Sequence, residues 1–247
     1  NMIVGILRAP GGCPWDIEQT HKSIRQGFIE DTYEVIESSD NDDPRLMCEE
    51  LGDVMLQVVF HADIERESGR FTFGDVIDGI CRKLIHRHPH VFGEVKADTV
   101  DAVLTNWDKI KNDEKSRRTV AQRLESIPPA LPALIRAEKV GRKAACFDFP
   151  DAESAMVKLR EEVDEVGEAM RGGSHEAIEE ELGDLLLTVT TVARKLNVES
   201  EEALTHATDK FIRRFSRVEA EVIAQGRDIN DINMQELDEI WEKIKHN

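Results

Sequence analysis

The sequence predicts an all-α protein built from two tandem copies of one helical-bundle domain. Three observations predict this fold class. Apolar residues recur at a three-and-four spacing in both halves of the chain, and strand-like alternation is sustained nowhere. A set of acidic, basic and aromatic residues recurs in the same order in the two halves. Aromatic residues make up only 5% of the 247 residues, fewer than a β-sandwich or barrel usually contains.

Composition and charge exclude several classes of function. Apolar residues make up 40% of the chain, enough for a packed core, so an intrinsically disordered protein is not expected. The formal net charge is −18, from 50 acidic and 32 basic residues. This acidity argues against nucleic-acid polymers and anionic membranes as partners, because both bind basic surfaces. A protein this acidic would need a metal ion between itself and any phosphate that it handles.

Cysteine usage and hydropathy predict a cytoplasmic protein. The four cysteines form no C-x-x-C pair and suit free thiols in a reducing compartment. No apolar run approaches 18 residues and no signal peptide is visible, so we expect neither a membrane span nor secretion. The sequence begins directly in a helical pattern, and we expect further residues before Asn1 in the full protein.

Proline and charge divide the chain into three segments. Three prolines fall within residues 128–132, a stretch that cannot form a helix interior. Residues 1–116 carry a net charge of −10, residues 117–143 of +5, and residues 144–247 of −13. We therefore predict a first helical domain over 1–116, a basic proline-containing connector over 117–143, and a second helical domain over 144–247.

Each predicted domain contains a helical hairpin. Apolar residues at helical spacing run from 46 to 64 in the first domain and from 178 to 196 in the second. A polar turn precedes each run, at 39–44 and at 172–174, and another helical pattern precedes each turn.

The two halves repeat a set of charged and aromatic residues. The acids Asp31, Glu34, Glu50 and Asp53 recur, all at one constant offset, as Glu162, Glu165, Glu181 and Asp184. With small changes of offset, the basic residues Lys83 and Arg87 recur as Lys210 and Arg214, and Trp107 and Lys111 recur as Trp241 and Lys245. Chance does not easily produce eight matches in one order, so the repeat indicates a duplicated domain.

The repeated acids predict a cation site in each hairpin. Acids three apart share one helix face, and Glu165 and Glu181 lie at equal distances from the turn between them. Four converging carboxylates repel one another unless a cation neutralises them, and hard oxygen ligands suit Mg²⁺ or Mn²⁺. The alternative is a solvated acidic face, which would explain a single E-x-x-E. The apolar residues around Asp53 and Asp184, together with the duplication, favour the metal site.

The repeated basic and aromatic residues suit a phosphate and a nucleoside. Lys210 and Arg214 are four apart and project together, so beside a metal they would clamp phosphates. A solvated helix face is the alternative. Trp241 could stack on a base or ribose, or it could pack in the core as part of an apolar stripe.

Two other groups are weaker candidates. Cys13 lies in an unusual Gly-Cys-Pro-Trp-Asp loop, but a nucleophilic cysteine needs a base and His21 is the only early candidate. The histidine cluster at 86–90 ends at a proline, which favours a cationic helix terminus over a metal site. No P-loop and no dinucleotide-binding glycine motif is present.

Several of these stretches resemble the MazG family of nucleoside triphosphate pyrophosphohydrolases. The resemblance rests on Gly-Cys-Pro-Trp-Asp-x-x-Gln-Thr-His at 12–21, Glu-Asp-Thr-Tyr-Glu-Val at 30–35, His-Arg-His-Pro-His-Val-Phe-Gly at 86–93 and the two Glu-Glu-Leu-Gly-Asp runs. It implies tandem all-α domains, a homodimer, Mg²⁺ as cofactor, and conversion of nucleoside triphosphates to monophosphates and pyrophosphate in nucleotide housekeeping.

The resemblance also implies roles for individual residues. Metal-binding, catalytic acids would be Glu162, Glu165, Glu181 and Asp184. Substrate-binding residues would be Lys158, Lys210, Arg214, Trp241 and Lys245. Asp31 departs from the family, whose usual acid there is Glu, and Glu30 points about 100° away around the helix. We therefore expect the second copy to be the main catalytic site.

Two alternatives remain at the level of sequence. A di-iron or di-manganese carboxylate oxidase would use paired E-x-x-H motifs, but the chain has a single one, Glu18 to His21, outside the repeat. A non-catalytic nucleotide sensor would keep the basic and aromatic residues, and the altered first copy could serve that role.

Overall fold

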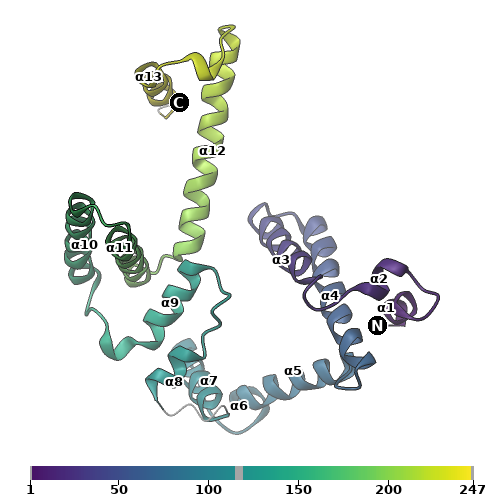
Figure 1. Ribbon diagram of the computed structural model, residues 1–247. Helices are drawn as coiled ribbons and strands as arrows, with labels where there is room; N and C mark the ends of the chain where they lie inside the picture. The colour runs from purple at the N-terminus through teal and green to yellow at the C-terminus, as the bar shows by residue number, and fades with distance from the viewer. Residues whose placement is uncertain (1, 115–118, 246–247) are drawn as a thin grey trace. The chain divides into compact units, whose positions relative to one another are not determined.

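The computed structural model describes residues 2–114 and 119–245, and these residues form helices and connecting turns without any strand. The chain divides into two compact units, Asn1–Lys111 and Asn112–Asn247. Figure 1 shows the helices along the chain, from purple at the N-terminus to yellow at the C-terminus. The predicted all-α class is confirmed.

The first unit centres on a helical hairpin. In chain order its helices are α1 (Met2–Arg8), α2 (Pro14–Glu18), α3 (Arg25–Asp40), α4 (Pro44–Glu67), α5 (Phe73–Arg87), α6 (Pro89–Phe92) and most of α7 (Val100–Glu114), which crosses the boundary between the units. Helices α3 and α4 lie side by side (Figure 1). Asp43 begins α4 by accepting hydrogen bonds from the backbone of Arg45 and Leu46, and Pro44 fits the first helical turn. The turn predicted at 39–44 therefore joins two antiparallel helices.

The core of the first unit lies where α1 meets the second half of α4. Four buried apolar residues form it: Val4, Ile24, Val59 and Phe60. Buried charges border this cluster, because Arg8 forms an ion pair of 3.5 Å with Asp63 and donates to the backbone of Asp16 at 2.6 Å. Arg8 therefore links α1 to both α2 and α4.

The second unit repeats the hairpin and adds a long helix. Its elements are α8 (Val120–Glu125), α9 (Ala133–Lys143), η1 (Ala145–Phe147), α10 (Ala152–Gly172), α11 (His175–Lys195), α12 (Ser200–Ala224), η2 (Ile229–Asp231) and α13 (Met234–Lys245). Gly173 adopts a left-handed conformation with φ of 74°, which glycine allows without strain, and Ser174 caps α11. The second predicted hairpin, α10 and α11, is confirmed (Figure 1).

The basic segment 117–143 belongs to the second unit. Its described part contains helices α8 and α9, and α9 packs against α8, α11 and α12. The prolines lie between the two helices, and Pro132 directly precedes α9. Helix α9 therefore packs against three other helices of the second unit.

A second core lies between α12 and α13. Its buried members are Val218, Val222, Ile232 and Ile240. The connection through η2 turns the chain so that α13 packs back on α12. None of the described helices combines the length and apolar character needed to cross a membrane.

Candidate functional site

Three carboxylates of the second copy converge between α10 and α11. Each of Glu162, Glu165 and Glu181 offers one oxygen, and these oxygens all lie within 4.8 Å of one another. Glu162 is only 4% exposed, and the other two are half-buried. The hairpin turn produces this convergence, because it brings the third acid, on α11, level with the two acids on α10.

One lysine adjoins this cluster. The Nζ atom of Lys158 lies 3.0 Å from Glu162 and 3.5 Å from Glu165, and it donates to Glu161 at 2.9 Å. Lys158 lies one turn before Glu162 on α10, so this contact follows from helical spacing. Hydrogen bonds to Glu161 and then to Glu162 raise the pKa of Lys158, which keeps its ammonium charged. The cluster thus combines three acids with one fixed cation.

The electrostatics of the cluster favour a bound cation. Burial raises the pKa of Glu181 above its ordinary value, and the charges of Glu165 and Asp184 raise it further. Like charges held this close disfavour ionisation, and a divalent cation would relieve that repulsion. Three hard carboxylate oxygens suit Mg²⁺ or Mn²⁺, so the donor set fits the ion that the sequence predicts.

The fourth predicted acid, Asp184, lies next to the cluster but outside it. Its side chain is exposed, and it does not belong to the group whose oxygens lie within 4.8 Å. It acts on the cluster through its charge, as a cause of the raised pKa of Glu181.

The predicted phosphate-binding residues lie on α12, away from these contacts. Lys210 is exposed and Arg214 is half-buried on α12, a helix that packs against α9, α11 and α13. Lys245, on α13, is exposed and pairs with Glu242 at 3.2 Å. The structure therefore joins only Lys158, among the predicted substrate-binding residues, to the acids.

Trp241 packs in the core rather than standing free. It contacts the buried cluster between α12 and α13, and its ring centroid lies 5.3 Å from that of Phe211. Phe211 stacks in turn on Phe215, with 6.0 Å between ring centroids. Of the two roles left open by the sequence, the packing role is the one seen in these contacts.

The first copy arranges its acids differently. Glu50 is buried, and burial followed by the charge and hydrogen bond of Glu34 raises the pKa of Glu50. Asp31 accepts a hydrogen bond of 2.8 Å from the side-chain amide of Gln57. Across residues 2–114, no three acids, Asp53 included, bring oxygens within 4.8 Å of one another.

The basic and aromatic residues of the first copy interact with one another. The guanidinium carbon of Arg87 lies 5.4 Å from the centre of the Trp107 ring, and His88 contacts the same ring edge-on at 4.9 Å. Lys83 is exposed on α5, and Lys111 is half-buried on α7. Helix α5 ends at Arg87, so the histidine cluster lies at a helix terminus, as the sequence predicts.

The weaker candidates from the sequence, Cys13, Glu18 and His21, lie at or near the ends of α2. Cys13 precedes the first residue of α2, whereas His21 hydrogen-bonds to His61 at 2.6 Å and to Glu65 at 2.5 Å. Helix α2 ends at Glu18, so Glu18 and His21 do not share the helix turn on which an E-x-x-H metal motif depends.

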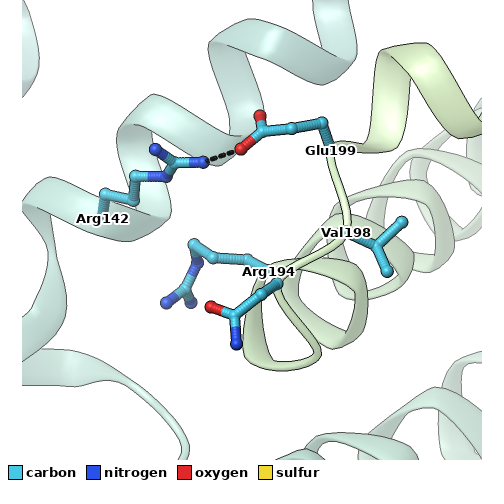
Figure 2. A pocket seen from close by; sticks show the side chains of 5 residues that line it. Arg142, Arg194, Val198 and Glu199 are labelled. Atoms are coloured by element: carbon cyan, nitrogen blue, oxygen red, sulfur yellow. Dashed lines mark hydrogen bonds and ion pairs between the residues drawn. The ribbon is translucent and has the colours of Figure 1, made fainter.

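A charged joint connects α9, α11 and α12. Arg142, Arg194, Asn197, Val198 and Glu199 line a pocket of about 340 Å³ there, shown in Figure 2. Arg142 donates to Glu199 at 2.6 Å, and Glu138 accepts a hydrogen bond from the backbone of Ser200, the first residue of α12. These bonds fix the start of the helix that carries the predicted phosphate clamp.

Sequence reasoning missed the joint and Gln57. The joint depends on contacts between positions far apart in the sequence, such as Glu138 and Ser200, which no local pattern reveals. The constant offset between the repeated acids also pairs Gln57 with Thr188. A comparison of the residues around the acids would therefore have shown that the two copies differ at this position.

Comparison with known proteins agrees with this duplication. The sequence model of the MazG nucleotide pyrophosphohydrolase domain matches residues 19–92 and 151–218. These two ranges contain all eight repeated acids, and Trp107, Lys111, Trp241 and Lys245 lie beyond them.

Two relatives extend the match over nearly the whole chain. The nucleoside triphosphate pyrophosphohydrolase/pyrophosphatase MazG of Thermotoga maritima is 43% identical over 241 residues, which cover 97% of this chain and 91% of that protein. The nucleoside triphosphate pyrophosphohydrolase of Escherichia coli K12 is 40% identical over 244 residues, covering 97% and 93%. The enzyme of the same name from Mycolicibacterium smegmatis is 36% identical over 146 residues, covering 58% and 44%. The chain therefore belongs to the MazG family and carries two tandem copies of its domain.

Proposed function

We propose that this protein is a Mg²⁺-dependent nucleoside triphosphate pyrophosphohydrolase, which cleaves the bond between the α- and β-phosphates to release a monophosphate and pyrophosphate. The cluster of Glu162, Glu165 and Glu181 beside Lys158 is the observation that carries the proposal. Family membership and the names of the full-length relatives support the same reaction.

We assign different roles in the reaction to the acids and the lysine of the second copy. Glu162, Glu165 and Glu181, with Asp184 at the edge, would hold Mg²⁺, which would screen the triphosphate charge and polarise the α-phosphate. Lys158 would donate a charge-assisted hydrogen bond to a phosphate oxygen. A carboxylate of the cluster that does not coordinate the ion would accept a proton from the attacking water.

We propose that Lys210 and Arg214 hold the departing pyrophosphate. Their spacing of four residues on one helix face supports this role. Trp241, on α13, would position α12, which carries these residues, by packing against Phe211.

We also propose that the protein acts as a homodimer. The hairpin that carries the acids leaves apolar side chains exposed beside them, including Val163 at 54% and Leu186 at 54%. Exposed apolar side chains grouped on one hairpin indicate a protein surface that another chain covers. Light scattering coupled to gel filtration would give twice the monomer mass of 28.0 kDa if this is correct.

The proposed function is tested by neutralising one acid of the cluster. Glu181→Gln should reduce pyrophosphate release from nucleoside triphosphates about 100-fold or more, because a ligand to the metal is lost. Glu179→Gln, on the exposed face of the same helix, is the matched control and should retain full activity. Full activity in Glu181→Gln would remove the second copy from the reaction.

A further inference from the structure

In the first copy, the side-chain amide of Gln57 binds Asp31, the first of the four repeated acids. The side-chain nitrogen of Gln57 donates to Oδ2 of Asp31 at 2.8 Å, across the hairpin from α4 to α3. The constant offset that relates the two sets of acids pairs Gln57 with Thr188. A threonine side chain is shorter and carries no amide, so the second copy has no counterpart of this hydrogen bond.

A glycine makes room for the amide. A Cβ atom placed on Gly27 would lie 3.1 Å from the side-chain nitrogen of Gln57, closer than ordinary van der Waals contact. The same offset pairs Gly27 with Lys158, the lysine that contacts Glu162 and Glu165. The two copies therefore differ at two adjoining positions: glycine and glutamine in one, lysine and threonine in the other.

These differences accompany a different arrangement of the acids. Glu162 contributes to the cluster of three oxygens in the second copy, whereas its counterpart Asp31 takes part in no such cluster among residues 2–114. Aspartate is one methylene shorter than glutamate, and one of its two oxygens, Oδ2, already accepts the hydrogen bond of the Gln57 amide. Asp31, Glu34 and Glu50 therefore do not form a three-acid cluster like that of the second copy.

We propose that Gln57 is a positioning residue that holds Asp31 out of a shared cation site, with Gly27 providing its space, so that each chain has one high-affinity site for Mg²⁺ or Mn²⁺. This inference rests on the proposed function, since it concerns the cation of that reaction. It assigns the two copies different roles: the second copy binds the metal, and the first is a related hairpin without a metal of comparable affinity.

Titration of the full-length protein with Mn²⁺, followed by electron paramagnetic resonance of the free ion, tests this assignment without nucleotide. The wild type should bind one Mn²⁺ per chain in its high-affinity class, and Glu181→Gln should weaken that class about 100-fold. Adding Asp31→Glu and Gln57→Thr to Glu181→Gln should restore one high-affinity Mn²⁺ per chain. Further change of Glu50→Gln should abolish the restored site.

Other results would overturn the inference. A Glu181→Gln variant that still binds one Mn²⁺ with wild-type affinity, lost only when Glu50→Gln is added, would place an intact site in the first copy. A folded triple variant that gains no site would show that Gln57 and Asp31 do not control cation binding. Circular dichroism establishes folding, and Asp31→Glu alone serves as a second variant, which should gain less affinity than the pair because Gln57 remains.

The same titration separates this inference from the proposed function. If the wild type binds no Mn²⁺, the metal-dependent function itself fails and this inference with it. If the wild type binds two equivalent ions and releases pyrophosphate, the function holds and only the assignment of Gln57 fails.

Discussion

The ammonium of Lys158 lies 3.0 Å from a carboxylate oxygen of Glu162 and 3.5 Å from one of Glu165. Lys158→Ala removes this positive charge from the acid cluster. We expect triphosphate binding to weaken about 10-fold or more, because a charged hydrogen bond is lost. Metal binding without nucleotide should strengthen roughly 3-fold, since a partly exposed ion pair no longer competes for the two acids.

Calorimetric titration with Mn²⁺ and with a non-hydrolysable triphosphate separates the two effects of Lys158→Ala. Arg160→Ala is the matched control, because Arg160 is exposed on the same helix. Unchanged Mn²⁺ affinity together with weaker triphosphate binding would show that the lysine serves the substrate alone.

The raised pKa of Glu181 makes a prediction about stability. Burial and the neighbouring acids disfavour its ionised form in the folded protein. A folded pKa above the unfolded value means that ionisation destabilises the fold as pH rises through this range. Glu181→Gln should therefore raise the melting temperature in EDTA at pH 8 and leave it nearly unchanged at pH 4.

Added Mg²⁺ should reduce or reverse the difference in melting temperature between Glu181→Gln and the wild type. The ion should stabilise the wild type more than the variant, because binding to the folded state stabilises it. Scanning fluorimetry at several pH values measures both effects. A variant that melts below the wild type in EDTA would contradict the account of repulsion at this acid.

Asp148 gives a pH dependence of opposite sign. Arg194 donates to both oxygens of Asp148, at 2.9 and 2.7 Å, and Lys195 lies 2.9 Å away. Hydrogen bonds from Arg194, and then from Lys195, hold the pKa of Asp148 well below its ordinary value despite burial. The stabilisation is therefore present above about pH 3.9, the unfolded value, and is lost as pH falls below it.

Asp148→Asn tests that linkage. The side chain of Asp148 is 11% exposed and that of Arg194 is 13% exposed, so the substitution leaves a largely buried guanidinium without its charged partner. We expect a loss of roughly 3 kcal/mol in the free energy of unfolding at pH 7, shrinking as pH falls toward 3. Urea unfolding at several pH values measures this difference, and a loss that is constant with pH would contradict it.

Trp241 is predicted to contribute to stability through its packing against the core between α12 and α13. Trp241→Ala should lower the free energy of unfolding by roughly 2 kcal/mol, because a half-buried ring loses its contacts with that core. Trp241→Phe keeps an aromatic ring in the same place and should cost less. Urea unfolding of both variants tests this role, and an alanine variant as stable as the wild type would show that the ring does not support the core.

The sequence predicted the helical hairpins because polar turns between apolar runs are local features. It also predicted that Glu165 and Glu181 come level, since equal distances from a turn determine their register. It could not place Asp184, because spacing defines a helix face but not the side-chain direction that brings an oxygen into the cluster. The packing role of α9 likewise depends on contacts with helices far along the chain.

The reaction itself is tested most directly by its products in ¹⁸O-labelled water. The protein is incubated with a panel of nucleoside triphosphates and Mg²⁺, and the products are separated and weighed by mass spectrometry. The proposed attack is at the α-phosphorus. The account therefore predicts a nucleoside monophosphate that carries one ¹⁸O atom from water, together with unlabelled pyrophosphate. A nucleoside diphosphate with labelled inorganic phosphate would contradict cleavage between the α- and β-phosphates.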